Sequence, residues 1–591
     1  MKAKPWPVLS SGLEFAAKGV SVRIVVSKRW LICLFLIPGW LFLVGICRAD
    51  DRFFGLEEVE AGQRGEWRTV AEGNELRTFQ LEIIGKVPNY LGPGKDAILA
   101  KALDAEHIRS GPVAGMSGSP VYIDGRLVGA YAFGYIWPKE QAIIGITPIE
   151  HMLGLLEEGR AGDAGPAFSE EAPLRPLPTP LLAAGFSGTT LDLFREEFAR
   201  FGLQPISGGG GSGTATAPRE LQPGSAMAAI LLKGDFSMAA TGTVTHREDD
   251  RVLGFGHPFL HWGEMEVPFG GAEILTIVRN LRISFKFSNP GEPVGTLYAD
   301  RTTGVAGLLG KVPAMSEISL ALQPEGSARR VYKAEAFRDS RLSPLLVAAV
   351  VAEALGQSLS AERDTTFIVQ AEIGIEGLAP RKVELAATGS NAHGRVAFGM
   401  MERLAPILDN PWGNRALESL HMEISATPGQ HVRRVETVRT HRSVYRPGDT
   451  VEAVVELRDE EGVSSREHLA LTIPENLPKD SRLELVVADA DERARLAETM
   501  PRRDLPPPEL LDRWAETRPA NGISLLLVRR STDFSSRGRS LPGLPPSVAR
   551  QLRTSGLAAS ADGRTVLAER HRRTSALITG SWRTPLPLEF Q

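Results

Sequence analysis

Gly115-Met116-Ser117-Gly118-Ser119-Pro120 is the stretch of sequence that decides the fold, because it joins a tight bend to a β-hairpin over residues 121–132. Glycine adopts backbone conformations that are closed to other residues. The two glycines around the serine therefore let the bend point two N–H groups at one spot beside the serine hydroxyl. Such an arrangement is typical of a turn that presents a nucleophile together with an oxyanion hole.

A histidine is the second requirement, because a serine is a poor nucleophile until a base takes its proton. His257 follows a predicted strand and stands between Gly256 and Pro258, where its ring can be held at a cleft. His261, four residues further on, is the alternative base. Taken alone, His257 fits a turn histidine that is satisfied by backbone hydrogen bonds. Beside the serine motif, a catalytic role is favoured.

These two motifs resemble those of the SpoIVB-type serine peptidases, which are chymotrypsin-like enzymes. The signature of that family is a Gly-Met-Ser-Gly-Ser-Pro nucleophile motif, a following strand pair and helix, and a Leu-Gly-His-Gly motif that bears the base. Ser117 matches the nucleophile, and His257 matches the base with phenylalanine and proline replacing the leucine and the second glycine. The resemblance covers roughly residues 80–157 and 226–312.

The order of the two motifs departs from the family. In the family the histidine segment precedes the serine segment, whereas here Ser117 precedes His257 by 140 residues. The two halves are therefore expected to be permuted. Geometry rather than chain order defines a catalytic triad, so a permuted chain can still assemble one.

The resemblance implies a Ser-His-Asp triad in which an aspartate orients the histidine. The aspartate of the family lies shortly before the serine motif, and Asp104 is the nearest match; a solvated loop acid fits this position equally well. The N–H groups of Gly115 and Ser117 are the expected oxyanion donors, while Ser119 is expected to support the turn. The fallback acids are Asp96, Asp249 and Asp300.

Changes of composition along the chain predict a mainly β protein with a few helices. The resemblance makes its core a permuted, chymotrypsin-like double β-barrel, and a β-sandwich-like domain is expected after it. The predicted segments are a leader (1–49), a serine-bearing β module (50–160), a linker with a Gly-rich loop (161–225), a histidine-bearing β module with a helical extension (226–429) and a β-rich C-terminal domain with a Pro/Arg-rich tail (430–591).

Three local patterns predict particular elements. Thr147 and Glu150 read as a capping box at the start of a helix. Residues 343–355 predict a helix that is buried on most sides. Apolar residues alternate with polar ones on a strand with one buried face, at Val451, Ala453, Val455 and Leu457.

The N-terminus has the pattern of an export signal or a membrane anchor. Six Lys/Arg precede an apolar run from Trp30 to Cys47, which Pro38-Gly39 interrupts. A cleavable signal is favoured over a retained anchor, because the run is shorter than the roughly 20 residues of a comfortable membrane span. The protein is therefore expected to be exported to the periplasm or outside the cell, with anchorage to the inner membrane as the alternative.

The composition of the chain limits the kinds of partner and cofactor that are expected. The net charge is −4, so nothing points to nucleic acid. Both cysteines, Cys33 and Cys47, fall within the leader, which excludes disulfides and cysteine-ligated zinc from the remaining chain. No metal or organic cofactor is expected, and the expected partner is a protein or peptide substrate. The sequence does not indicate an oligomeric state.

Three hypotheses of function follow. The first is an exported serine endopeptidase that acts on envelope proteins. The second is a catalytically inactive envelope protein that keeps the peptidase fold for interaction. The third is a protein that processes only its own chain, at the Gly-rich loop near Gly208 or near Pro501.

Overall fold

The computed structural model describes residues 51–590 except 135–141, 157–174, 209–216, 281–283, 358–363, 479–480, 498–504, 532–533, 537–538, 542–543, 555–558 and 561–562. Strands make up 53% of it and helices 17%, which confirms the expected mainly β class. The predicted leader, the Gly-rich loop after Gly208 and the cut site near Pro501 lie outside the described residues. Within them, no helix is both long enough and apolar enough to cross a bilayer.

The serine motif belongs to a closed barrel of six antiparallel strands, called the serine barrel below. Its strands are β1 (Arg64–Glu72), β2 (Glu75–Gly92), β3 (Lys95–Ala102), β5 (Ser119–Ile123), β6 (Arg126–Gly134) and β7 (Ile143–Pro148). Hydrogen bonds link them in the order β5-β1-β2-β3-β7-β6, and β6 pairs back with β5. Trp67, Leu81 and Tyr131 are fully buried inside it. Shorter elements flank it: η1 (Leu56–Glu58), α1 (Ala105–Ser110), β4 (Val113–Ala114), α2 (Ile149–Leu153) and β8 (Arg175–Pro176).

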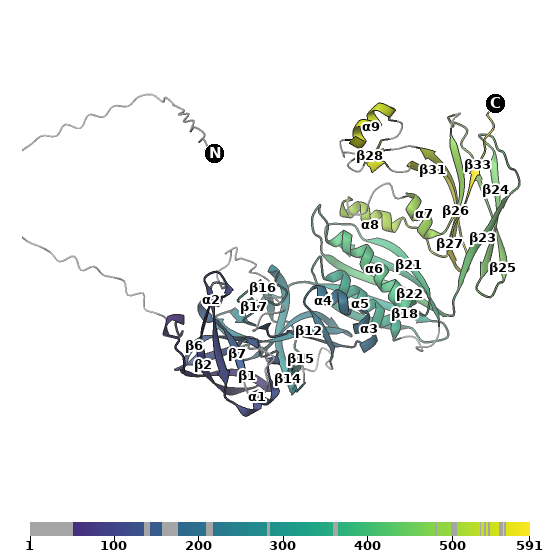
Figure 1. Cartoon of the computed structure of the whole chain (residues 1–591). Helices are drawn as coiled ribbons and strands as arrows, with labels where there is room; N and C mark the ends of the chain where they lie inside the picture. The colour runs from purple at the N-terminus through teal and green to yellow at the C-terminus, as the bar shows by residue number, and fades with distance from the viewer. Residues whose placement is uncertain are drawn as a thin grey trace, which may run out of the picture. The chain divides into compact units, whose positions relative to one another are not determined.

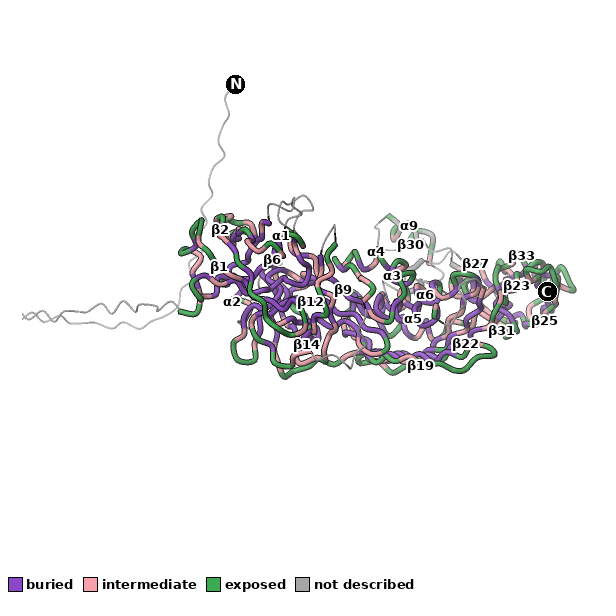
Figure 2. The backbone as a smooth tube through the Cα atoms, turned by 90° about the horizontal axis from the view of Figure 1, so that it is seen from below, coloured by how far each residue is buried: buried purple, intermediate pink, exposed green. Residues whose placement is uncertain are grey.

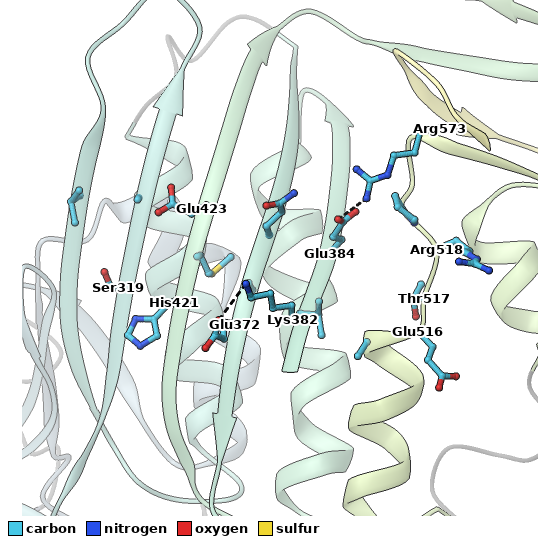
Figure 3. A pocket seen from close by; sticks show the side chains of 18 of the residues that line it. Ser319, Glu372, Lys382, Glu384, His421, Glu423, Glu516, Thr517, Arg518 and Arg573 are labelled. Carbon is cyan, nitrogen blue, oxygen red and sulfur yellow. Dashed lines mark hydrogen bonds and ion pairs between the residues drawn. The ribbon is translucent and has the colours of Figure 1, made fainter. Parts of the chain in front are cut away.

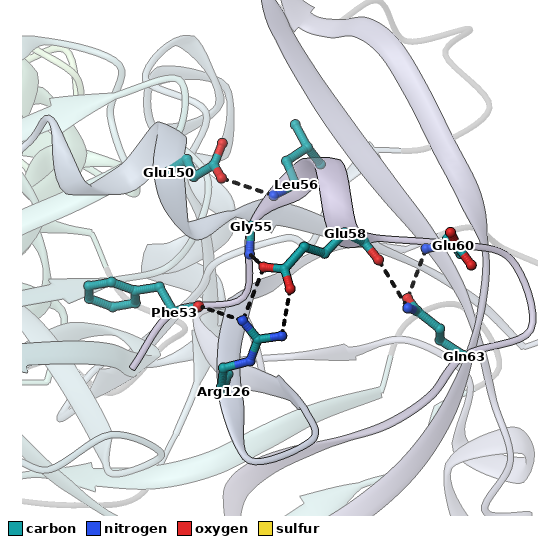
Figure 4. Close-up of polar contacts among 8 residues, drawn as sticks. All are labelled: Phe53, Gly55, Leu56, Glu58, Glu60, Gln63, Arg126 and Glu150. Atoms are coloured by element: carbon teal, nitrogen blue, oxygen red, sulfur yellow. Dashed lines mark hydrogen bonds and ion pairs between the residues drawn. The ribbon is translucent and has the colours of Figure 1, made fainter. Parts of the chain in front are cut away.

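The short segment that carries η1, before β1, binds the β5–β6 hairpin that follows the serine motif (Figure 4). Arg126, beside the hairpin turn, donates two hydrogen bonds to the carboxylate of Glu58, at 3.0 and 2.7 Å. The N–H of Leu56 donates to Glu150 at 2.9 Å. These contacts tie the hairpin and α2 to the same short segment.

The histidine motif lies in a second set of six antiparallel strands, called the histidine ring below. They are β11 (Ala226–Gly234), β12 (Ser237–Glu248), β13 (Arg251–Gly254), β14 (Gly263–Val278), β16 (Gly295–Arg301) and β17 (Gly304–Leu309). Their order is β12-β13-β17-β16-β14-β11, and β11 also pairs with β12, so the pairings return to the first strand. The strands of the histidine ring are mostly buried, whereas in the serine barrel strand β2 is largely exposed (Figure 2).

Two backbone connections join the serine barrel to the histidine ring. Strand β15 (Ser284–Pro290) pairs with β14 on one side and with β4 on the other. Gly73 and Ile274 exchange both backbone hydrogen bonds, at 2.6 and 3.0 Å. The serine and histidine motifs are therefore held together by main-chain pairing as well as by side chains.

Part of the predicted linker is structured. β9 (Pro180–Ala184) pairs with β12, and β10 (Gln204–Ser207) pairs with β9. Between them lie α3 (Gly188–Leu193) and α4 (Arg195–Arg200), whose Leu191 and Phe198 join the main core. The expectation of a linker over 161–225 is thus wrong for 175–207, because apolar residues there find a place beside β12.

The sheet continues past the histidine ring through β19 (Arg330–Phe337), β18 (Met315–Pro324), β22 (Leu417–Pro428), β20 (Thr365–Ile375) and β21 (Arg381–Gly389). Helices α5 (Ser343–Gly356) and α6 (Ala392–Leu408) lie side by side on one face of these strands (Figure 1). Every residue of α5 from Ser343 to Leu355 is buried, which confirms the predicted buried helix.

The C-terminal residues form two four-stranded sheets with a shared core. One contains β23 (Val432–Thr440), β24 (Thr450–Asp459), β25 (Ser464–Thr472) and β32 (Leu577–Thr579), and the other β26 (Arg482–Ala488), β27 (Gly522–Ser531), β31 (Gly563–Arg573) and β33 (Trp582–Leu586). Both contribute to one apolar cluster, as in a sandwich. The four predicted inward residues of β24 are all buried. The remaining elements are α7 (Ala490–Ala497), α8 (Pro507–Ala515), α9 (Pro546–Thr554), β28 (Phe534–Ser536), β29 (Arg539–Leu541) and β30 (Ala559–Ser560).

Candidate active site

Ser117 lies in the bend between β4 and β5, called the serine loop below (residues 115–119). Gly115 and Gly118 have φ values of +90° and +93°, a region that favours glycine. The Ser119 hydroxyl donates to the carbonyl of Met116 at 2.5 Å, which confirms its expected structural role. The bend therefore has the backbone shape that the sequence predicts.

The N–H groups of the serine loop fall into two sets. Those of Met116, Gly118 and Ser119 donate to carbonyl groups of β4, of the serine barrel and of the loop itself, respectively, at 2.8–3.1 Å. The other two, on Gly115 and Ser117, are the pair predicted as oxyanion donors. Using these two would leave the three hydrogen bonds that hold the bend undisturbed.

His257 lies just after β13, on a segment called the histidine loop below (residues 255–262). Its Nδ1 is 2.8 Å from the carbonyl oxygen of Pro258. Because a carbonyl only accepts, Nδ1 carries the proton, and Nε2 of the neutral ring is left as the basic nitrogen. This is the tautomer that a general base needs. Burial lowers the pKa of His257 to about 4, so the ring is neutral at physiological pH.

The serine and histidine loops pack backbone against backbone, although 140 residues separate Ser117 from His257. The N–H of Thr243 on β12 donates to the carbonyl of Ser117 at 2.8 Å. A Cβ atom on Gly118 would lie 2.0 Å from the Thr243 carbonyl oxygen and 2.4 Å from the N atom of Phe255. The fold thus brings the two predicted motifs side by side.

Thr147 on β7 of the serine barrel contacts the histidine loop, and this contact corrects the predicted capping box. Its hydroxyl donates to the carbonyl of Gly256 at 2.6 Å instead of capping a helix. The helix α2 begins at Ile149 with Pro148 as its N-cap residue and no side-chain cap. The Thr147 hydroxyl therefore binds the histidine loop and does not cap α2.

The reactive atoms of the two motifs are buried and unpaired. Ser117 is 0% and His257 1% exposed. Within the described part of the chain, neither Ser117 Oγ nor His257 Nε2 has a hydrogen-bond partner, so the predicted Ser–His hydrogen bond is not formed here. A buried polar atom without a partner costs stability, about 1–3 kcal/mol each, and calls for an explanation.

Asp104 is not brought to His257, which corrects the predicted triad. It precedes α1, and its carboxylate accepts from the N–H of Gln80 at 2.5 Å. Nδ1 of His257 is bonded to Pro258 instead. A main-chain carbonyl therefore sets the tautomer that the aspartate was expected to set.

Asp300 is the acid that reaches the histidine loop. It is fully buried on β16, and its carboxylate accepts from the N–H groups of Phe259 (2.8 Å), Leu260 (2.7 Å) and Trp262 (3.3 Å). Burial raises the pKa of Asp300, and these N–H groups oppose that rise.

The two remaining fallback acids lie away from the histidine loop. The Asp96 carboxylate accepts from the N–H of Asn89 at 2.8 Å, and Asp249 lies in the turn between β12 and β13. Among the four candidate aspartates, Asp300 is therefore the one whose carboxylate binds the segment that carries the base.

Lys286 on β15 carries a buried amine that sequence reasoning missed. Its stem lies against Gly115, and its Nζ donates to the hydroxyl groups of Thr69 (2.7 Å) and Thr243 (3.2 Å). Among the described residues no carboxylate pairs with it. Burial lowers the pKa of Lys286 to about 7.

Substitution of Gly118 by alanine is expected to separate the two loops. The new Cβ would meet main-chain atoms at 2.0 and 2.4 Å, at a φ of +93°. We expect a loss of unfolding free energy of about 3 kcal/mol or more in chemical denaturation. Gly125→Ala is the matched control, because its φ is +76° with nothing within 4 Å, and should cost about 1 kcal/mol. Equal losses would contradict the close packing.

The stability of the protein should rise with pH above neutrality because of Lys286. Its pKa is about 7 when folded and 10.5 when unfolded, so the unfolded chain binds more protons between these values. The unfolding free energy then increases with pH, by up to about 1.4 kcal/mol per unit. Chemical denaturation at pH 7–10 should show that Lys286→Met flattens this rise. Parallel curves for both proteins would be the opposing result.

A separate cavity of about 760 Å³ lies over the outer face of strands β18–β22 (Figure 3). Three ion pairs line it, and none of its lining residues belongs to the serine or histidine loop. The pairs are Arg329–Glu423 (2.7 Å), Lys382–Glu372 (3.9 Å) and Arg573–Glu384 (2.9 Å). Ser319 and His421 also line this cavity, which shares no residue with the two motifs.

Known proteins give no independent indication of what this site does. No protein-family model matches the chain, and no curated protein or solved structure is significantly similar to it. The geometry of the two loops is therefore the basis for proposing a function.

Proposed function

We propose that the protein is a serine endopeptidase with Ser117 as nucleophile and His257 as general base, related to the SpoIVB-type peptidases. The observation that carries this proposal is the packing of the two loops, with both reactive atoms buried and unpaired. Two buried polar atoms without partners, on loops that pack together, are costly in a protein without a use for them.

The proposed reaction follows from the atoms present. His257 Nε2 takes the proton of Ser117 Oγ as the oxygen attacks a peptide carbonyl, and the N–H groups of Gly115 and Ser117 stabilise the oxyanion. The imidazolium then protonates the leaving amine, and a water repeats both steps on the acyl-enzyme. The carbonyl of Pro258 accepts a hydrogen bond from Nδ1–H throughout and stabilises the imidazolium.

The proposed fold is a permuted chymotrypsin-like double barrel. Each of the two six-stranded rings carries one reactive residue, and the loops meet between them. Asp300 lies on the same ring as His257, 43 residues after it, and binds the main chain of the histidine loop, while the carbonyl of Pro258 has the tautomer-setting role that was predicted for Asp104. The substrate is a protein or peptide, and the leader supports export to the cell envelope.

A second function, a catalytically inactive interaction protein, is favoured by one specific observation. Ser117 and His257 are 0% and 1% exposed, and no hydrogen bond joins them. An inactive relative would keep the packing of the loops but would not react.

Labelling with a fluorophosphonate separates the two functions. The full exported chain should acquire one adduct, which mass spectrometry should locate on Ser117. A protein that folds normally by circular dichroism and remains unlabelled would contradict the peptidase and support the inactive alternative. Shortening of the purified chain over time, absent in Ser117→Ala, would indicate self-processing.

A further inference from the structure

We infer that Lys286 is a positioning residue for the serine loop and acts on it through Thr243. This inference rests on the proposed role of Ser117. Lys286 and Thr243 lie on β15 and β12, and both are fully buried.

Thr243 is the residue that holds the serine loop on both sides of Met116. Its hydroxyl donates to the carbonyl of Gly115 at 3.0 Å, and its N–H donates to the carbonyl of Ser117 at 2.8 Å. Its own carbonyl accepts from the N–H of Phe255 at 3.3 Å. One residue thus contacts the segments that carry the nucleophile and the base.

The amine of Lys286 fixes the direction in which the Thr243 hydroxyl donates. That hydroxyl has one proton, and it is used on Gly115, so toward Lys286 the oxygen can only accept. The second acceptor of the amine is the Thr69 hydroxyl. Two acceptors match the two N–H bonds of a neutral amine, and the pKa of about 7 that burial produces agrees with this form.

Without the amine of Lys286, the Thr243 hydroxyl could donate its hydrogen bond to a different acceptor. Its oxygen is 3.5 Å from the hydroxyl oxygen of Thr69, to which it could then donate. The carbonyl of Gly115 would lose its partner, and the Gly115–Met116 peptide could turn. Ser117 would then be displaced from His257, although neither reactive residue was changed.

A double-mutant cycle tests this inference on the full exported chain, with a fluorophosphonate as the probe. Lys286→Met and Thr243→Val should each lower the rate constant of inactivation by about 10- to 100-fold, with little change in reagent binding. The double variant should be no slower than the slower single variant, because both changes break one connection. Thr241→Val is the matched control, since Thr241 contacts Ser288 across the same two strands at 2.6 Å. It should label at the wild-type rate.

Hydrogen exchange gives a second measurement that does not depend on activity. The amides of residues 113–119 should exchange about 10-fold faster in Lys286→Met and Thr243→Val, and at the wild-type rate in Thr241→Val. Additive rate losses, or unchanged labelling and exchange in Lys286→Met, would overturn the inference. If the wild type is not labelled, the proposed function fails, and exchange alone decides whether Lys286 positions the loop.

Discussion

Ser117→Ala and His257→Ala are each expected to lower peptide hydrolysis by at least about 10⁴-fold. Alanine at 117 removes the atom that forms the acyl-enzyme, and alanine at 257 removes the nitrogen that accepts its proton. Because the two side chains act as a unit, the double variant should be hardly slower than either single variant. The hydrolysis rates of the two single variants and the double variant can be measured under steady-state conditions with a peptide substrate.

Ser119→Ala is the control that separates the nucleophile from its neighbour. Ser119 shares the bend, but its hydroxyl is used on the carbonyl of Met116. Its loss should cost about 1 kcal/mol of stability and leave the enzyme labelled on residue 117. Full activity in Ser117→Ala, or an adduct on Ser119, would refute the assignment of the nucleophile.

Asp300→Asn is expected to lower hydrolysis by about 100-fold or more, whereas Asp104→Asn should change it by less than about threefold. The Asp300 carboxylate accepts three N–H groups of the histidine loop, and an amide would present N–H groups to some of them. Hydrogen bonds to a charged group contribute about 1.5–3 kcal/mol each, so the loop should shift. A misplacement of roughly 1 Å at a catalytic group can cost about 100-fold in rate.

Asp104→Asn is the comparison variant, because it makes the same change from carboxylate to amide at a residue that does not bind the histidine loop. An asparagine there can still accept from Gln80 and is an equally good residue before a helix. Rates for the two variants, measured beside their thermal unfolding, distinguish a shifted loop from a general loss of fold. The reverse order of effects would restore Asp104 as the triad acid.

The local features of the site could be predicted, because each depends on residues that are close together in the sequence. The bend at Ser117 depends on two glycines beside it, and the structural role of Ser119 on its place in the same turn. His257 was recognisable by its glycine and proline neighbours. Its packing against the serine loop was not, since 140 residues separate the two.

The contacts that hold the site together join residues that are far apart in the sequence. No local sequence pattern predicts them. Thr147 fits a capping box by sequence, but its hydroxyl binds Gly256 across the two rings. On β15 the alternation of Ser284, Lys286 and Ser288 with two phenylalanines favours burial of the aromatic rings. The structure buries the polar set more deeply, because strands β1 and β12 supply hydroxyl partners for it.

The main-chain bridges between the two rings limit how this protein can admit a substrate. A hinge that opened the rings would have to break the β4–β15 pairing and both bonds between Gly73 and Ile274. The β4 pairing ends one residue before Gly115, so such an opening would also distort the serine loop. For the proposed peptidase, we therefore expect access to Ser117 to come from motion of surface segments and not from opening of the two rings, so that the rate of this motion would set an upper limit on turnover.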